Sequence, residues 1–143
     1  MMDTKLRILD TDILSLIQRQ NEIVANRLQS LPPTQAAIAI VTVEEQMRGW
    51  VARIKREKKL ENLISLYARF QAVVLSYSQM PVLPFDDKAV YHFQKLRYLQ
   101  TRLGLRDLRI AAIALACDGV LVTANVRHFR QISGLTIEDW TVA

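Results

Sequence analysis

Short apolar runs alternate with longer stretches of helical periodicity along this chain. Residues 6–9 form a short apolar run interrupted by Arg7, and residues 36–41 form a second apolar run. The second run carries no charge and is rich in β-branched side chains, as expected for a strand buried on both faces. Between the two runs, apolar residues recur every three or four positions over residues 13–31, which predicts one amphipathic helix. The pair Pro32-Pro33 would end that helix.

The rest of the chain continues this alternation of helices and short strands. Gly104 is expected just after a helix, in the C′ position that glycine favours. Strands that alternate with helices predict an α/β fold with a mostly parallel sheet. A length of 143 residues favours one domain that spans residues 1–143. The further helices are expected at residues 43–56, 60–78, 86–102 and 108–117, and the further strands at residues 120–123 and 135–137.

Composition and charge narrow the class of protein. Half of the residues are apolar, which is enough for a core, and the single cysteine excludes an intramolecular disulfide and favours a reducing compartment. No apolar stretch approaches the ~20 residues that span a bilayer, and the first residues lack the apolar segment of a signal peptide. We therefore expect a cytoplasmic protein without membrane contact. Its net charge of +5 favours a polyanionic partner such as nucleic acid.

Acidic side chains follow the expected strands at the points where those strands end. Ligands of open parallel sheets bind beyond the carboxyl ends of the strands, so these side chains are expected along one edge of the sheet. Carboxylates that repel one another are stabilised together by a divalent cation. Oxygen ligands without His or Cys favour Mg²⁺ or Mn²⁺ over Zn²⁺. The residues concerned are Asp10, Asp12, Glu44, Glu45 and Asn125, with Asp107 at the start of the helix that leads into the third strand.

Each of these residues also has a purely structural interpretation. Asp10 or Asp12 could cap the first helix, and Asp107 could cap the Ala-rich one. The segment 42–45, Thr-Val-Glu-Glu, fits a capping box. Asn125 could be an ordinary turn residue. Capping and catalysis are compatible, because a helix N-terminus fixes the orientation of a carboxylate.

Four segments of the chain resemble the motifs of a known family. Residues 9–14 (LDTDIL), 41–45 (VTVEE) and 103–112 (LGLRDLRIAA) resemble the three acidic motifs of PIN-domain nucleases, and residues 121–129 (LVTANVRHF) resemble the C-terminal signature of VapC-type toxins. The resemblance covers nearly the whole chain in the same order. It implies a single PIN-like domain with a three-layer α/β/α architecture. It also implies a Mg²⁺- or Mn²⁺-dependent endoribonuclease, the toxin half of a type II toxin–antitoxin pair.

The resemblance also implies roles for particular residues. Asp10, Glu45 and Asp107 match the metal-binding acids of the family, and Asn125 matches a fourth catalytic position where many members have Asp. Asp12 stands where Asn is common, which adds negative charge near the metal. The residues expected to orient water, a second ion or the scissile phosphate are Thr11, Asp12 and Thr123.

RNA must be bound by cations rather than by these acids. Arg106 and Arg109, which flank Asp107, and Arg127 are the leading candidates. The further candidates are Arg48, Arg53, Lys55 and Arg56. The family likeness implies two protein partners, a second copy of the chain in a homodimer and an antitoxin. Two alternatives remain open, a PIN nuclease of RNA maturation and a catalytically weak PIN module that binds a partner in a repressor complex.

Overall fold

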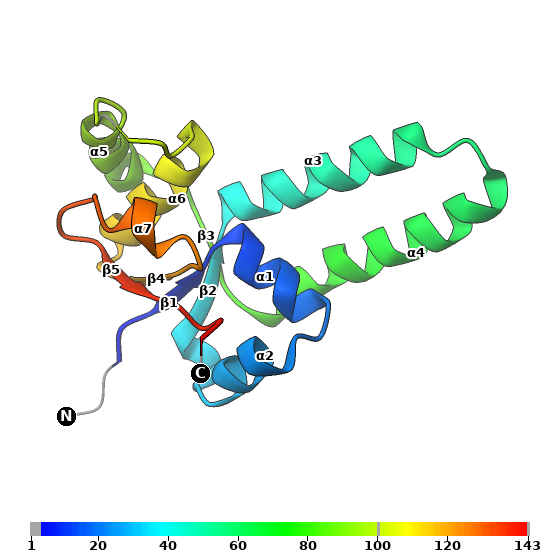
Figure 1. Cartoon of the computed structure of the whole chain (residues 1–143), viewed down its shortest axis with the longest axis horizontal. Coiled ribbons are helices and arrows are strands. Elements are labelled where there is room, and N and C mark those ends of the chain that lie inside the picture. The colour runs from blue at the N-terminus through cyan, green and yellow to red at the C-terminus, as the bar shows by residue number, and fades with distance from the viewer. Residues whose placement is uncertain (1–3, 100, 143) are drawn as a thin grey trace.

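A five-stranded sheet forms the centre of the protein in the computed structural model, which describes residues 4–99 and 101–142 (Figure 1). All four pairings between neighbouring strands are parallel. The expected α/β fold is therefore confirmed. The strands are β1 (Arg7–Leu9), β2 (Ala36–Ala39), β3 (Val82–Leu83), β4 (Val120–Val122) and β5 (Thr136–Glu138), in the spatial order β3-β2-β1-β4-β5.

Helices connect the strands, and most of them cover the two faces of the sheet (Figure 1). Two single-turn 3₁₀ segments, Pro33–Gln35 and Tyr77–Gln79, lead into β2 and β3. The α-helices are α1 (Thr11–Gln18), α2 (Glu22–Gln29), α3 (Ile40–Arg56), α4 (Leu60–Ser76), α5 (Asp87–Leu96), α6 (Leu105–Ala116) and α7 (Val126–Phe129).

The alternation of side chains along the central strands produces two separate cores. Ile8 and Leu121 belong to the core under α5 and α6, whereas Leu9 and Val122 belong to the core under α1 and α2. Successive residues of a strand point to opposite faces, so neighbouring apolar residues bury on both sides. The fully apolar run of β4 and the adjacent pair Ile8-Leu9 in β1 follow from this, and the layering is the expected α/β/α.

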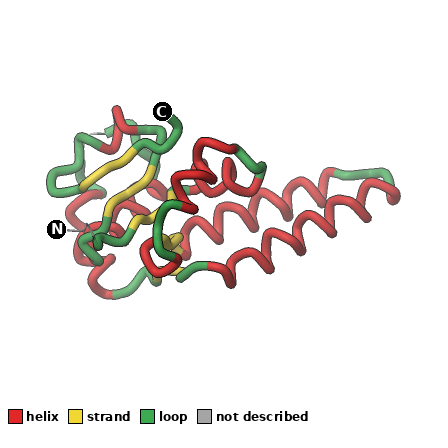
Figure 2. The backbone as a smooth tube through the Cα atoms, turned by 90° about the horizontal axis from the view of Figure 1, so that it is seen from below, coloured by secondary structure: helices red, strands yellow, loops and turns green. Residues whose placement is uncertain are grey.

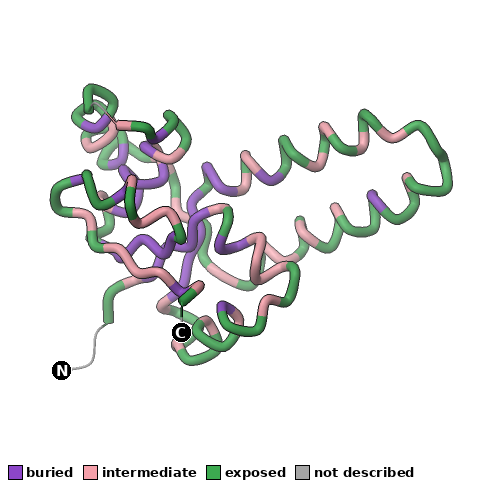
Figure 3. The backbone as a smooth tube through the Cα atoms, in the orientation of Figure 1, coloured by how far each residue is buried: buried purple, intermediate pink, exposed green. Residues whose placement is uncertain are grey.

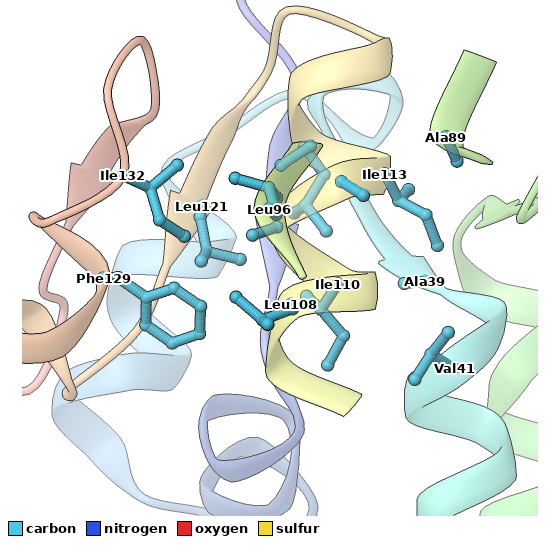
Figure 4. Close-up of a cluster of buried hydrophobic side chains, with 14 of the residues drawn as sticks. Ala39, Val41, Ala89, Leu96, Leu108, Ile110, Ile113, Leu121, Phe129 and Ile132 are labelled. Atoms are coloured by element: carbon cyan, nitrogen blue, oxygen red, sulfur yellow. The ribbon is translucent and has the colours of Figure 1, made fainter. Parts of the chain in front are cut away.

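Helix α6 packs closely on its face of the sheet because much of its surface is alanine. Figure 4 shows Leu108 of this helix turned toward Leu121 and Phe129, whereas Ile110 and Ile113 belong to the same core on the side of Val41 and Ala39. All seven of these residues are at most 5% exposed. This packing fixes the first turn of α6, and with it the position of Asp107.

Helices α3 and α4 form a long hairpin that extends beyond the layered body (Figures 1 and 2). Each helix has 17 residues, which corresponds to about 26 Å of length. Most of the distal hairpin is exposed, in contrast to the buried strands (Figure 3). Its apolar residues include Leu60 and Ile64, which are 78% and 77% exposed. The hairpin thus presents a large accessible surface on both of its helices.

The segment predicted as one helix over residues 13–31 is instead two helices, and that expectation was wrong. The break falls at Gln20, whose φ of 63° is left-handed and incompatible with a continuing helix. Asn21 then caps α2, because its side chain accepts a hydrogen bond from the Val24 amide at 3.1 Å. The apolar periodicity passes through this break because α1 and α2 bury against the same core.

Other element boundaries also differ from the expected ones. The second strand ends at Ala39, and Ile40 already begins α3. Strand β3 was not predicted, since two residues between prolines carry no periodicity. Gly104 is the N-cap of α6 and not the end of the preceding helix, which stops at Leu96. Residue 100, within that expected helix, lies outside the described residues.

No helix in the described ranges combines the length and the apolar character needed to cross a bilayer.

Candidate functional site

The strand order creates a crevice at the carboxyl ends of β1 and β4. From β1 the chain proceeds to β2 on one side, whereas β4 and β5 lie on the other. Such a switch point is where open parallel sheets bind ligands. Asp10 follows β1 and Thr123 follows β4, and the two strands stay paired there, since the Asp10 amide donates to the Val122 carbonyl at 3.0 Å.

Asp10 is the most buried acid of this edge, with 6% of its surface exposed. Its Oδ1 accepts the Ile13 amide at 2.9 Å and caps α1, so the capping interpretation is also correct for this residue. The pKa of the Asp10 carboxyl is raised from 3.8 to about 6, chiefly by burial and also by the charges of Asp12 and Asp107, while the hydrogen bonds from Thr123 and Ile13 act in the opposite direction. The protein therefore holds this carboxylate at an electrostatic cost.

Glu45 and Asp107 reach the same place from two other helices. Glu45 lies in the second turn of α3, and Asp107 lies in the first turn of α6. Burial raises the pKa of both carboxyls, and each carboxyl also responds to the charge of Asp12. Glu45 and Asp107 interact with each other electrostatically, and Arg106 lowers the pKa of Glu45. The structure thus brings the predicted acids into one electrostatic cluster.

Asp12 is exposed at the first turn of α1, and its charge acts on all three of the other acids. Glu44 lines the same depression as Glu45 and Asp107, but its carboxylate is paired with Arg48 at 2.8 Å. Among the residues that the structure describes, no three acidic, His or Cys side chains are already close enough to enclose an ion. The acids therefore lie near one another, but their side chains are not arranged in a ready-made metal-binding geometry.

Hydroxyl groups organise the interior of the cluster. The Thr11 hydroxyl donates to Glu45 Oε1 at 3.1 Å and lies 3.2 Å from the hydroxyl of Thr42. Thr42 is fully buried inside α3, so the predicted capping box is wrong: Ala39 is the N-cap and makes no side-chain bond. The sequence pattern indicated only a helix-capping role for Thr42. Its burial beside Glu45 follows from α3 beginning earlier than expected.

Asn125 has a partner that the sequence did not indicate. Asn125 is the N-cap residue of α7 without a side-chain cap bond, and its Oδ1 instead accepts from His128 Nδ1 at 2.8 Å. The Asn125 amide donates to Thr123 Oγ1 at 3.0 Å, which links the residue to the end of β4. His128 also lowers the pKa of Asp107 through its charge. The two residues are three apart on one helical turn, which is the only local signal for the pair.

The three leading arginine candidates line two different hollows. Arg106 lines a depression of about 540 Å³ with Glu45 and Asp107. Arg109 lines the same depression, and its guanidinium lies 5.6 Å from the centre of the Phe93 ring. Arg127 lines a separate hollow of about 440 Å³ beside His128. Of the three, Arg106 is the one whose charge acts on the acids directly.

The parallel sheet, its switch point and the acidic cluster together define an α/β protein of the PIN-nuclease type. No family model matches the chain. It is 30% identical over 139 residues to the tRNA(fMet)-specific endonuclease VapC of Salmonella typhimurium, covering 93% of this chain and 96% of that protein. It is 29% identical over 140 residues to ribonuclease VapC1 of Haemophilus influenzae, covering 94% and 97%. The chain belongs to the VapC ribonuclease family.

Solved structures agree with this assignment. A chain of the DNA-bound VapBC complex from Salmonella typhimurium superposes with a TM-score of 0.77 at 28% identity, covering 95% of this chain and 98% of that one. A chain of VapBC-1 from nontypeable Haemophilus influenzae gives 0.75 at 26% identity, covering 96% and 99%. The PIN-like fold and the family resemblance expected from the four sequence motifs are confirmed.

Proposed function

We propose that this chain is a metal-dependent endoribonuclease and the toxin component of a toxin–antitoxin pair. The observation that carries the proposal is the cluster of mutually interacting carboxylates around buried Asp10, at the switch point of a VapC fold. The relatives' names support RNA cleavage: one is a ribonuclease and one is a tRNA(fMet)-specific endonuclease.

The donor set fits a hard divalent cation. Asp10, Glu45 and Asp107 offer carboxylate oxygens, and burial together with their mutual repulsion leaves negative charge that the protein itself does not neutralise. Mg²⁺ and Mn²⁺ prefer such oxygens. We assign these three residues as ligands of Mg²⁺ or Mn²⁺. A bound ion would supply an activated water and stabilise charge on the phosphoryl oxygens.

The remaining residues of the site orient these groups. Thr11 holds Glu45 through its hydroxyl, and Thr123 holds Asp10. The His128 ring N–H keeps the Asn125 carbonyl oxygen turned toward α7, so the amide N–H₂ group remains free to donate to water or phosphate. Asp12 is exposed and adjacent to all three acids, which suits an outer role in ordering water.

We infer two protein partners, an antitoxin and a second copy of this chain. Solved relatives are VapBC complexes, and one is described as a toxin–antitoxin complex. Apolar side chains remain exposed on α5 and the turn that follows it, with Tyr91 and Tyr98 at 56% and 74% exposure, which supports burial against another subunit. Light scattering of the chain alone and with its co-expressed antitoxin tests both partners, and a monomer in both samples would refute the homodimer.

The decisive experiment compares Glu45→Gln with its neighbour Glu44→Gln. Both variants remove one carboxylate from the same turn of α3, but only Glu45 belongs to the acidic cluster. Labelled total RNA is incubated with each protein in Mn²⁺, Mg²⁺ or EDTA. We expect discrete, metal-dependent bands from the wild type and Glu44→Gln, and none from Glu45→Gln.

Mapping the ends of the bands would identify the RNA target. Equal cleavage by Glu45→Gln would refute the assignment of the site. If the folded wild type neither cuts RNA nor binds Mn²⁺, the chain is a partner-binding module and not a nuclease.

A further inference from the structure

A cleft of about 750 Å³ runs from the acidic cluster along the α3–α4 hairpin. Thr11 and Glu45 line its inner end, so the cleft opens directly onto the proposed catalytic site. Its outer part lies between α1, α3 and α4. Glu45 is the only acidic residue among those that line it, whereas four arginines do so: Arg19, Arg53, Arg56 and Arg69.

Two of these arginines are held in place by an aromatic pair. Trp50 of α3 stacks on Phe70 of α4, with ring centres 6.3 Å apart and planes inclined by 21°. The Arg53 guanidinium lies 4.8 Å from the centre of the Trp50 ring, and that of Arg69 lies 5.1 Å from it. Cations at such distances are attracted to the ring, which restricts their motion. One tryptophan therefore positions two guanidinium groups that come from different helices.

The positive charge of these two groups is not cancelled within the protein. Among the described residues, neither Arg53 nor Arg69 forms an ion pair with a carboxylate. Both residues are exposed at the rim of the cleft. Side-chain entropy is usually lost when an arginine binds an anion, and the contact with Trp50 has already removed part of it.

We propose that Arg53 and Arg69, positioned by Trp50, bind backbone phosphates of the RNA strand that enters the acidic site. The proposal deepens the nuclease function above and rests on it. A single RNA strand presents regularly spaced phosphates, and a cleft that leads from unpaired arginines to the reacting acids matches such a strand along its length. Arg56 extends the same basic rim away from the site. We call Arg53, Arg69 and Trp50 together the clamp. It requires both helices of the hairpin, because Arg53 and Trp50 lie on α3 and Arg69 lies on α4.

The test measures RNA binding by full-length protein that carries Asp107→Asn to prevent cleavage. The probe is a fluorescein-labelled single-stranded RNA of mixed sequence, and its anisotropy is followed over a range of salt concentrations. Arg53→Gln/Arg69→Gln is compared with Arg27→Gln/Lys88→Gln, which removes two exposed charges outside the cleft. Arg27 also contacts an aromatic ring, that of Trp140 at 5.8 Å, so the control matches one cation–aromatic contact.

We expect the cleft variant to bind RNA more weakly and with a shallower salt dependence. Each phosphate contact to a single strand contributes about 0.7 to the slope of log K against log salt, so loss of two contacts lowers the slope by about 1.4. The control variant keeps the slope of the parent protein. If the double variant does not fold, the single variant Arg56→Gln, which makes no aromatic contact, should lower the slope by about 0.7.

Different failures refute different statements. If the wild type cuts RNA but the cleft variant and the control bind it alike, the proposed clamp is wrong and the nuclease function stands. If the wild type neither binds nor cuts RNA, the nuclease function fails and the clamp fails with it. A poly-glutamate peptide serves as a second probe: loss of peptide binding with unchanged RNA binding would assign the cleft to an acidic protein segment and overturn the proposal.

Discussion

Replacing Asp10 with Asn should stabilise the metal-free protein while abolishing its activity. The asparagine keeps an oxygen that can accept the Ile13 amide, so the cap of α1 persists. The substitution removes a buried carboxyl group whose pKa is raised from 3.8 to about 6. A shift of about two units corresponds to roughly 3 kcal/mol at 1.36 kcal/mol per unit. For a chain of this size, that amounts to an increase in Tm of about 10 °C at neutral pH.

The pH dependence gives the prediction its sign. The folded state binds the Asp10 proton more tightly than the unfolded state, so the ionised carboxylate costs stability above pH 6 and the cost decreases as the pH falls toward 3.8. Thermal melts in EDTA at pH 7.5 and pH 4 measure this difference. The advantage of Asp10→Asn should be about 3 kcal/mol at pH 7.5 and fall to about 0.5 kcal/mol at pH 4.

A second helix cap provides the control. Asp86 caps α5 by accepting the Ala89 amide at 3.0 Å, but it is exposed and outside the acidic cluster. Asp86→Asn should therefore leave the Tm within a few degrees of the wild type, because an exposed cap changes little when Asn replaces Asp. A lower Tm for Asp10→Asn at pH 7.5, or a gain at pH 4 as large as that at pH 7.5, would refute the argument from burial and repulsion.

Three further predictions concern the metal, the core and a close backbone approach. Mn²⁺ at ~100 times its Kd should stabilise the wild type by about 2.7 kcal/mol in thermal melts. Asp107→Asn should lose this stabilisation together with RNA cleavage and growth arrest on expression. If the variant is stabilised by Mn²⁺ as much as the wild type, Asp107 is not a ligand. Trp140→Ala, at a side chain 2% exposed, should lower the urea-unfolding free energy by about 3–5 kcal/mol, and a loss below 1 kcal/mol would contradict its core position. Gly119→Ala would place a Cβ against Ile8 Cδ1 and 2.9 Å from the Leu6 carbonyl oxygen, so we expect a loss of about 1–3 kcal/mol in the same assay; wild-type stability would contradict the close approach at this position.

The central strands could be predicted from the sequence because burial on both faces leaves an uninterrupted apolar run. Residues 120–122 of β4 have this character, and residues 6–9 around β1 have it apart from Arg7; both positions were right to within a residue. Strand β3 could not be found, since it is two residues long and exists through its pairing with β2. The break at Gln20 was missed for a related reason. Helical periodicity indicates which side chains reach the core. Because α1 and α2 both pack on the same core, the periodicity continues across the turn at Gln20.

The acids could be predicted from their sequence positions, but their partners could not. Asp10 and Asn125 follow buried strands, and the sheet rule alone brings them to one edge. Glu45 was expected just beyond a strand, yet it lies six residues after β2, in the second turn of α3. Its place in the cluster depends on that helical turn. The contact between Trp50 and Arg69 joins α3 to α4 across the hairpin. No local sequence pattern predicts a contact between residues so far apart in the chain.

The strand order also determines when during synthesis this protein acquires its site. Strand β1 is made first and lies at the centre of the sheet, between β2 and β4. Its neighbour β4 begins only at Val120, so β1 lacks one of its two partners until more than four fifths of the 143 residues have been made. Pairing between segments so far apart in the chain is slow, because loop closure must precede it. A chain interrupted before Val120 carries Asp10, Glu45 and Asp107 but has no β4 to form the other wall of their crevice. We therefore expect the proposed activity to appear only as the last strands join the sheet.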